Sequence, residues 1–187
     1  MYLGIDPSLS ATGLCILDKD LKVIDYRVIS YPAGDPHRLL NYYWMLHKYI
    51  KKHKLKRIGI EGYAYGAGKQ GIGMVINIGE HGGALRVAMQ AHDIEYLAPT
   101  PGQIKKFITG NGRAEKKDVM KRIKKDYGIK LKWDKKQLLD LYDAVGVSIL
   151  TYFFYRRKRR KELDADQRDI LRTIDLRIIK QRLKIFR

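Results

Sequence analysis

The stretch Met1-Tyr-Leu-Gly-Ile-Asp-Pro-Ser-Leu-Ser10 runs an apolar segment directly into a carboxylate, and the rest of the chain is organised around it. Residues 2–5 have the apolar and small side chains of a buried strand. Pro7 lacks an N–H and ends the ladder, and the serines after it favour a turn. We therefore expect a strand that presents Asp6 at its end. Alone, an Asp-Pro pair is more typical of a carboxylate that caps a turn, so the acids downstream decide its meaning.

The composition indicates one domain of ordinary size with a polyanionic partner. The chain has 187 residues, 45% of them hydrophobic, which is enough to bury a core. Its 38 Lys and Arg outnumber 20 Asp and Glu and leave a formal net charge of +18, a field that favours nucleic acid. Ribosomal and membrane-surface proteins share this charge, so it does not indicate catalysis. The single cysteine, Cys15, excludes an intramolecular disulfide and fits a small core residue.

Neither a signal peptide nor a membrane span is expected. No cleavable apolar segment opens the chain, and the longest apolar run, residues 138–155, carries two aspartates and is marginal in length for a span. We expect a cytoplasmic protein with no membrane partner and no small-molecule cofactor.

The hydrophobic pattern predicts an α/β fold. Strands are expected at 2–5, 12–18 and 22–30 as an antiparallel meander, and at 57–61 and 95–98. Helices are expected at 35–54, 74–92, 100–107, 115–127 and 134–154. The first helix should take Asp35 as its N-cap and proline at its first position, and capping boxes at 100–103 and 134–137 should open two others.

Two glycine-rich segments follow the fourth strand. Residues 63–73 contain Gly68-Lys69 but lack the flanking residues of a phosphate-binding P-loop. They fit either a flexible loop beside a site, with Tyr63 and Tyr65 free to stack on bases, or a merely mobile surface loop. The small residues within Gly79–Ala88 cost helix stability, which indicates close approach of the sheet or of a second subunit.

Four carboxylates carry the chemistry. Asp6 and Glu61 end two apolar strands, and Asp140 and Asp143 are the only charges between residues 138 and 154, one turn apart on one helix face. Ionised acids in a buried helix are costly unless a cation meets them, and a metal ion or nearby caps and lysines could do so. Oxygen ligands without a Cys/His cluster favour Mg²⁺ or Mn²⁺. If the two strands are neighbours, the acids converge and suit two divalent ions, an arrangement that hydrolyses phosphodiesters.

Four short motifs, in order and spacing, give the chain a family resemblance. They are Gly4-Ile-Asp-Pro-Ser8 with Thr12-Gly13, Ile60-Glu61, the Gly-x-Gly-x-Ala-x-Lys segment within 110–119, and Asp140-Leu-Tyr-Asp-Ala144. With them the chain resembles the RuvC-type Holliday-junction resolvases of the RNase H-like superfamily over residues 1–155. The segments 61–66 and 79–83 resemble the phage-borne branch more than the bacterial housekeeping enzyme.

The resemblance implies a fold, an activity and a site. The fold would be RNase H-like over residues 1–155: a five-stranded mixed sheet flanked by helices. Residues 156–187 run beyond the usual end of the family's core, and we expect them to form a basic helical C-terminal extension. The activity would be that of a Mg²⁺-dependent crossover junction endodeoxyribonuclease of recombination and repair, in the cytoplasm of a bacterium or phage-infected host. A homodimer joined near Gly79–Ala88 would cut opposed strands of a four-way junction and leave 5′-phosphate and 3′-hydroxyl ends. Its two ions, Mg²⁺ or alternatively Mn²⁺, would be held by Asp6, Glu61, Asp140 and Asp143.

The resemblance also implies residues that contact DNA. Lys116 or Lys117 would lie near the scissile phosphate, and Tyr63 or Tyr65 would wedge the junction centre. The full set of expected DNA contacts is Tyr63, Tyr65, Lys69, Lys105, Lys106, Arg113, Lys116, Lys117, Arg156 and Arg157.

The C-terminal extension departs from the family. Residues 151–187 hold thirteen Lys and Arg against five Asp and Glu, and an apolar stripe through Leu171, Ile174, Ile178 and Ile185 favours one long helix. This helix fits a DNA-binding arm or extra dimer contact, and equally a solvated helix folded back on its own core.

Two other functions stay open. A non-catalytic basic nucleic-acid-binding module on the same fold would have no use for a buried acid pair, and an RNase H-like nuclease acting on RNA or flaps would use the same acids.

Overall fold

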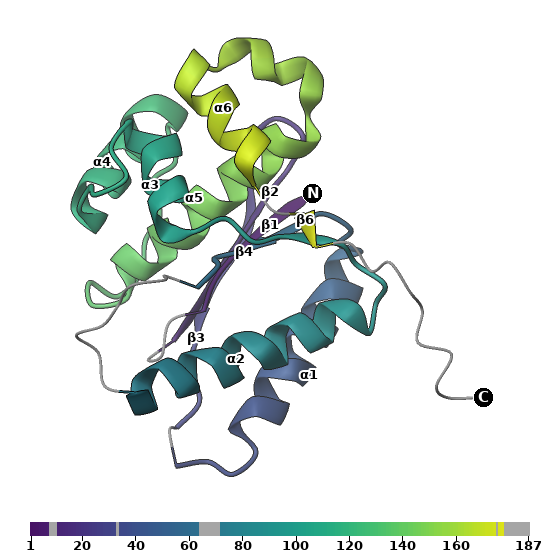
Figure 1. Ribbon diagram of the computed structural model, residues 1–187. Helices are drawn as coiled ribbons and strands as arrows, with labels where there is room; N and C mark the ends of the chain where they lie inside the picture. Colours follow the sequence, from purple (N-terminus) through teal and green to yellow (C-terminus); the bar gives the residue numbers. More distant parts are fainter. Residues whose placement is uncertain (8–10, 33, 64–71, 175, 178–187) are drawn as a thin grey trace.

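A mixed β-sheet forms the centre of the protein (Figure 1). The computed structural model describes residues 1–7, 11–32, 34–63, 72–174 and 176–177. The strands lie in the order β3-β2-β1-β4-β5-β6. They are β1 (Tyr2–Pro7), β2 (Thr12–Leu17), β3 (Val23–Ile29), β4 (Ile58–Ile60), β5 (Tyr96–Leu97) and β6 (Leu176–Arg177). The first three form an antiparallel meander, β1, β4 and β5 run parallel, and β6 is antiparallel to β5. The predicted five-stranded mixed sheet is confirmed, with β6 as a short addition.

Helices cover both faces of the sheet because its central strands are apolar on both sides. Leu3 and Ile5 face a core shared with α1 (Arg38–His53) and α2 (Ile72–Gln90). Tyr2 and Cys15 face the other core, under α3 (Pro101–Thr109), α4 (Lys116–Tyr127) and α5 (Leu138–Tyr155). Figure 1 shows the two helix groups on opposite sides of the strands. The site described below lies on the α5 side.

Helix α5 packs with its backbone against the sheet. The three central strands β2, β1 and β4 each place a glycine beneath it, namely Gly13, Gly4 and Gly59. A Cβ atom at Gly4 would lie 2.2 Å from the carbonyl oxygen of Ala144, so only glycine permits this approach. Ser148 Oγ also donates a hydrogen bond to the carbonyl of β1 at Tyr2, 2.8 Å away. The start of α5 is thereby fixed over the end of β1.

Replacing Gly4 with alanine should therefore be strongly destabilising. The new methyl group would meet backbone atoms of α5, which cannot rotate away, so we expect a loss of about 3 kcal/mol or more, the upper end for overpacking. Chemical denaturation of Gly4→Ala measures this loss. Gly34→Ala is the matched control, since a Cβ there meets no atom within 4 Å. A Gly4→Ala protein as stable as the control would refute the tight packing of α5.

One of the three predicted caps is confirmed. The capping box at 100–103 opens α3, with Thr100 and Gln103 bonded reciprocally. The caps predicted for α1 and α5 are wrong. Asp35 accepts the N–H of the residue two positions later, as Asp134 also does, and the helices begin three and four residues after these acids. Each aspartate side chain thus accepts an N–H of the turn that precedes its helix and none of the first helical N–H groups, which is local side-chain bonding in place of capping.

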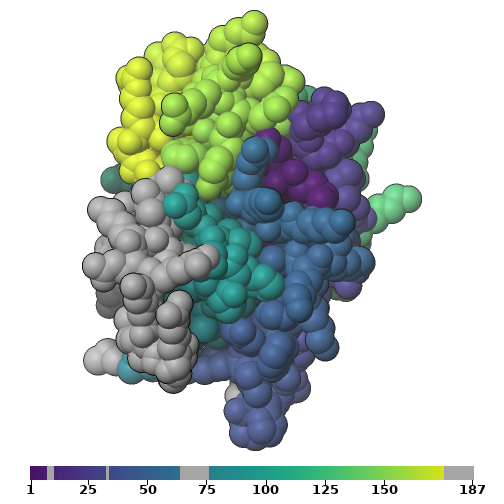
Figure 2. Space-filling model, turned by 90° about the vertical axis from the view of Figure 1, so that its right-hand side faces the viewer, coloured from purple at the N-terminus to yellow at the C-terminus, as the bar shows by residue number. Residues whose placement is uncertain are grey.

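The described part of the C-terminal extension, residues 156–174 and 176–177, folds back on the core. It forms a 3₁₀ helix (Arg157–Glu162), α6 (Ala165–Thr173) and β6, so the single helix predicted from the apolar stripe is wrong. Leu171 and Ile174 are buried, and Gln167 Nε2 donates to the Phe107 carbonyl of α3 at 2.9 Å. The space-filling view shows the 3₁₀ helix and α6 continuous with the rest of the surface (Figure 2). The other two members of the stripe, Ile178 and Ile185, lie outside the described residues.

By length and composition α5 could cross a membrane, but 72% of this segment is buried inside the protein. Its burial against the sheet is that of a core helix.

Candidate active site

Three carboxylates meet where β1 ends beneath the first turns of α5. Asp6, Asp140 and Asp143 each offer an oxygen, and these oxygens lie within 4.8 Å of one another. Asp6 faces α5 because strand residues alternate and Gly4, two residues earlier, contacts that helix. Asp6 is only 6% exposed, and the two helix acids are largely buried. The result is a buried anionic cluster built from two distant segments.

Glu61 adds a fourth carboxylate from the neighbouring strand. Its backbone N–H donates to the carbonyl of Ile5 at 2.9 Å, so Glu61 follows β4 directly beside the end of β1. Burial, followed by the charge of Glu61 and a side-chain hydrogen bond between the two acids, raises the pKa of Asp6 well above its usual range. Burial likewise raises the pKa of Glu61. The structure thus brings together all four acids that the sequence singled out.

Lys116, the first residue of α4, supplies a cation to the cluster. Its Nζ lies 2.6 Å from Asp140 Oδ1 and 2.7 Å from Asp143 Oδ2. Burial lowers the pKa of Lys116, but the charge of Asp143 and the hydrogen bonds that the lysine donates to both acids outweigh burial and raise it overall. The lysine of the Gly-x-Gly-x-Ala-x-Lys segment is therefore charged and in direct contact with the acids.

The donor set fits a divalent metal ion. One lysine does not neutralise four acids, and burial raises the pKa of Asp143 as well. Asp6 Oδ2 is buried without a hydrogen-bond partner, an arrangement that is costly unless a cation binds it. All four side chains offer oxygen, which suits hard cations such as Mg²⁺ or Mn²⁺. A cavity of about 150 Å³ lies beside the acids, lined by Glu61, Pro101, Ile104, Lys105, Lys116 and Asp143.

The metal-free protein should lose stability as the pH rises. Because burial raises the pKa values of Asp6, Glu61 and Asp143, the folded state binds more protons than the unfolded chain above the ordinary carboxyl range. The stabilising contribution is complete below that range and is lost as pH climbs through the raised values. We expect Tm in EDTA to fall as the pH rises above the ordinary carboxyl range.

Two controls separate this effect from other titrations. Asp6→Asn should show a shallower decline, since it removes one of the shifted groups, and added Mg²⁺ should flatten the decline in the unsubstituted protein. Equal slopes in the two proteins, with and without Mg²⁺, would contradict a strained acid cluster.

The other predicted contact residues are distributed unevenly. Lys105 lines the cavity beside the acids, and Lys106, Arg113 and Lys117 are exposed on α3, the following loop and α4. Arg156 and Arg157 lie beyond the far end of α5, roughly 20 Å along the helix from Asp143 at 1.5 Å per residue, so the structure does not bring them to the acids. Tyr65 and Lys69 lie outside the described residues.

Tyr63 is held by a residue that the sequence did not single out. Arg86 of α2 places its guanidinium 4.5 Å from the Tyr63 ring centroid, donates to the Tyr63 hydroxyl at 3.0 Å, and donates to the Glu61 carbonyl at 3.4 Å. Arg86 therefore fixes the segment that follows a candidate metal ligand. The sequence signal that could have identified Arg86 is that it is the only Lys or Arg in a helix rich in small residues.

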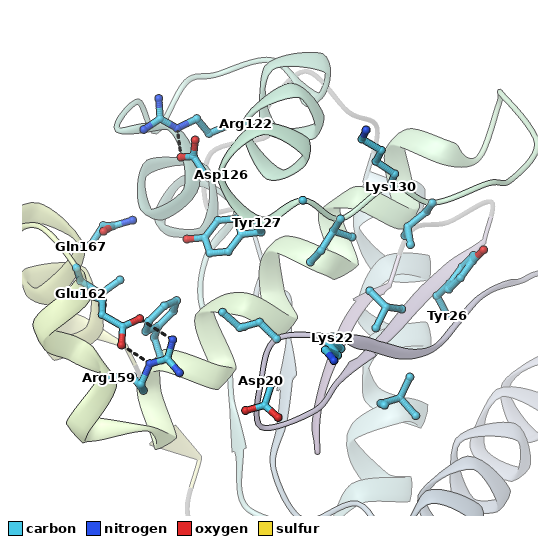
Figure 3. Close-up of a pocket in the computed structure, with 18 of the residues that line it drawn as sticks. Asp20, Lys22, Tyr26, Arg122, Asp126, Tyr127, Lys130, Arg159, Glu162 and Gln167 are labelled. Carbon is cyan, nitrogen blue, oxygen red and sulfur yellow. Dashed lines mark hydrogen bonds and ion pairs between the residues drawn. The ribbon is translucent and has the colours of Figure 1, made fainter.

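A separate cavity of about 910 Å³ lies between β3, the end of α4 and the C-terminal extension (Figure 3). Its walls carry two ion pairs, Arg122 with Asp126 and Arg159 with Glu162. None of the four acids lines it. Because these charges are paired with each other, we place the reaction at the acid cluster.

One known protein family matches the segment of the chain that carries these acids. The family model "Crossover junction endodeoxyribonuclease RuvC" matches residues 2–151, most of the chain. The chain belongs to the RuvC family. This confirms the predicted resemblance and the predicted enzyme class, a nuclease of branched DNA. Asp6, Glu61, Asp140, Asp143 and Lys116 all lie within the span that matches RuvC.

RuvC relatives cover most of the chain. The RuvC of Chloroherpeton thalassium is 29% identical over 157 residues, 81% of each chain. The RuvC of Syntrophomonas wolfei is 30% identical over 162 residues, 82% of this chain and 89% of the relative.

Solved structures of Holliday junction resolvases share the fold. Thermus thermophilus RuvC in complex with a Holliday junction superposes with a TM-score of 0.67 at 21% identity, covering 83% of this chain and 94% of that one. The yeast mitochondrial Holliday junction resolvase gives a TM-score of 0.52 at 15% identity, covering 86% and 83%. The expected RNase H-like fold is thus confirmed.

Proposed function

We propose that this protein is a homodimeric, Mg²⁺-dependent endonuclease that resolves four-way DNA junctions in recombination and repair. The observation that carries the proposal is the group of four carboxylates that meets Lys116 where β1 and β4 end beneath α5, in a chain of the RuvC family. The nuclease unit would comprise residues 1–155 and the appended unit residues 156–187. The protein would work in the cytoplasm of a bacterium or phage-infected host.

The residues divide the chemical work among them. Asp6, Glu61, Asp140 and Asp143 would hold two ions, Mg²⁺ or alternatively Mn²⁺, which when bound lower the pKa of the attacking water and stabilise the leaving 3′ oxygen. Lys116 touches two of these acids from the cavity side and would meet a phosphate there. The products would carry 5′-phosphate and 3′-hydroxyl ends.

Exposed cations next to the cavity would position DNA. Lys105 lines the cavity, and Lys106, Arg113 and Lys117 extend from it over the neighbouring surface. Such residues bind phosphates irrespective of the base sequence. They would therefore fix the position of the DNA strand on the protein without selecting a particular sequence. Arg156 and Arg157, distant from the acids, would contact a more remote part of a junction arm, and Tyr63 or Tyr65 would stack at its centre.

A purely binding module is the weaker alternative. Phosphate is repelled by carboxylates, and a module without chemistry gains nothing from an orphaned buried oxygen on Asp6. The alternative of an RNA or flap nuclease uses the same acids and is decided by substrate choice.

Cleavage of defined substrates tests the function. A synthetic four-way junction, a linear duplex, a flap and an RNA–DNA hybrid are compared with Mg²⁺ and with EDTA. We expect symmetric cuts in opposed strands of the junction, only with the metal, and end labelling that reports 5′-phosphates. Preferential cutting of the flap or hybrid would favour the alternative nuclease, and binding without cutting in any metal would favour the module.

The outer face of α2 would form the dimer interface. A methyl group added at Gly79 or Gly83 would meet no atom within 4 Å, so the small size of these residues serves no contact within the described chain. Ile76 and Val87, on the same side of the helix, are 55% and 53% exposed. Small residues flanked by exposed aliphatic ones suit a second helix at close range.

Gly83→Leu should weaken dimerisation without unfolding the subunit. The leucine would project from α2 into the space that the partner's backbone needs, while it meets no atom of its own chain within 4 Å of the Cβ. We expect at least a tenfold higher dissociation constant, about 1.4 kcal/mol, by sedimentation equilibrium. Gly34→Leu, also at an open position, is the control. A wild-type protein that sediments as a monomer at micromolar concentration would reject the interface.

A further inference from the structure

A buried hydrogen bond joins α2 to the hairpin that carries Asp6. His81 Nε2 lies 2.8 Å from Thr12 Oγ1, and both residues have no exposed surface. The two residues are 69 positions apart in the chain. A side-chain bond without access to water is electrostatically stronger than an exposed one, so it holds the two segments in one relative position.

Thr12 stands one ladder position away from the β2 residue that pairs with Asp6. In the β1–β2 ladder Thr12 pairs with Pro7, and the next pair joins Gly13 to Asp6. Pro7 contributes no N–H to the ladder, so the Thr12–Pro7 pair is weaker than a regular strand pair. The bond from His81 reinforces it from the face of the sheet opposite α5.

The imidazole itself is fixed by packing. The ring of Tyr42 lies 4.0 Å from the His81 ring at an interplanar angle of 32°, and Tyr31 packs edge-on against Tyr42 at 4.8 Å. Aromatic contacts on the ring restrict its rotation, so Nε2 stays directed at the threonine. The histidine ring is therefore held in one orientation, in which it bonds Thr12, and does not merely fill space in the core.

His81 also faces away from the outer side of α2. Gly79 and Gly83 stand two residues before and after it, and two residues turn an α-helix by about 200°. One turn of helix thus presents small residues outward and the bonded histidine inward. The inward-facing histidine thus connects α2 to the end of the β1–β2 hairpin.

We propose that His81 is a positioning residue, which through Thr12 ties α2 to the strand end that carries Asp6 and so links the seating of α2 to the geometry of the acid cluster. The proposal rests on the proposed function, because it assumes that the cluster cleaves junction DNA. His81 touches neither the acids nor the substrate in this scheme.

Steady-state cleavage of a four-way junction with Mg²⁺ tests the link. His81→Leu and Thr12→Val should each lower kcat by about 10–100-fold, the range for groups that support metal ligands, while the KM for the junction stays within about twofold. His81→Gln should recover most of kcat, because its amide offers both a donor and an acceptor near the position of Nε2. Combining Thr12→Val with His81→Leu should cost no more than either alone.

Controls separate positioning from loss of stability. Met89→Ala removes a fully buried side chain two turns further along α2, so it should lower Tm without lowering kcat. His81→Leu should remain dimeric by sedimentation, since its side chain faces inward. If that variant does not fold, Thr12→Val and Thr12→Ser give the same comparison, with the serine expected to retain kcat.

Three results would overturn the proposal: unchanged kcat in both His81→Leu and Thr12→Val, failure of His81→Gln to recover activity, or an equal loss of kcat in Met89→Ala. Absence of cleavage by the unsubstituted protein would instead reject the proposed function, so the two failures are distinguishable.

Discussion

Asp6→Asn should reduce metal-dependent junction cleavage by at least about 100-fold, because even partners that only support metal ligands cost 10–100-fold when removed. Asparagine keeps the shape of the side chain but lacks the charge that a divalent ion requires. Rates are measured at saturating junction over a range of Mg²⁺ concentrations. The loss should persist at high Mg²⁺, since the second oxygen of a carboxylate cannot be replaced by the amide nitrogen.

The same substitution should stabilise the metal-free protein. Burial and the neighbouring Glu61 make an ionised Asp6 unfavourable, so a neutral side chain removes repulsion and Tm in EDTA should rise. Asp166→Asn, at an exposed position on α6, is the matched control and should change neither property. Like Asp6→Asn, the substitutions Glu61→Gln and Asp143→Asn should lower metal-dependent cleavage and raise Tm in EDTA. Normal cleavage by a folded variant would remove that residue from the site.

Lys116→Met should produce the second largest change. The lysine contacts both α5 acids, so its loss should lower cleavage by about 10–100-fold and also remove the cation that partly neutralises the cluster. In EDTA we expect a loss of stability of about 1–2 kcal/mol, less than the 3–5 kcal/mol of a fully buried pair because Lys116 is 43% exposed. Cleavage rates and denaturant titrations measure the two effects.

Metal ions should partly compensate for the missing lysine. Mg²⁺ should therefore raise Tm more in Lys116→Met than in the unsubstituted protein. Lys117→Met, the neighbouring exposed lysine, is the control and should leave metal-free stability unchanged. If Lys117→Met were the slower enzyme, the scissile phosphate would lie nearer to that side chain.

Much of the site was readable from the sequence because its residues stand at the ends of regular elements. Asp6 and Glu61 end apolar strands, and Asp140 and Asp143 interrupt an otherwise apolar helix, so their convergence needed only that β1 and β4 pair. From the family resemblance alone, Lys116 or Lys117 was expected near the scissile phosphate, and the direct contact of Lys116 with two of the acids was not predicted. No local pattern in α4 distinguishes it from the neighbouring lysine.

Other features were not readable because they depend on tertiary contacts. Asp35 and Asp134 have the chemistry of helix caps, yet each bonds a nearer N–H and the helices start later. In the extension, Leu171 and Ile174 fit a helical period, but both are buried against the core while the chain turns into β6. The apolar period records which side chains are buried and not where the backbone changes direction.

The close packing that the glycines beneath α5 permit determines when the repulsion between the site carboxylates is overcome. With the backbone of α5 in contact with three strands, the carboxylates of the helix and that of β1 belong to one rigid body. Their mutual repulsion is overcome once, during folding, by the packing of that body, and not again at each catalytic cycle. A site of this kind meets its ions already assembled, so little reorganisation separates the bound substrate from the transition state.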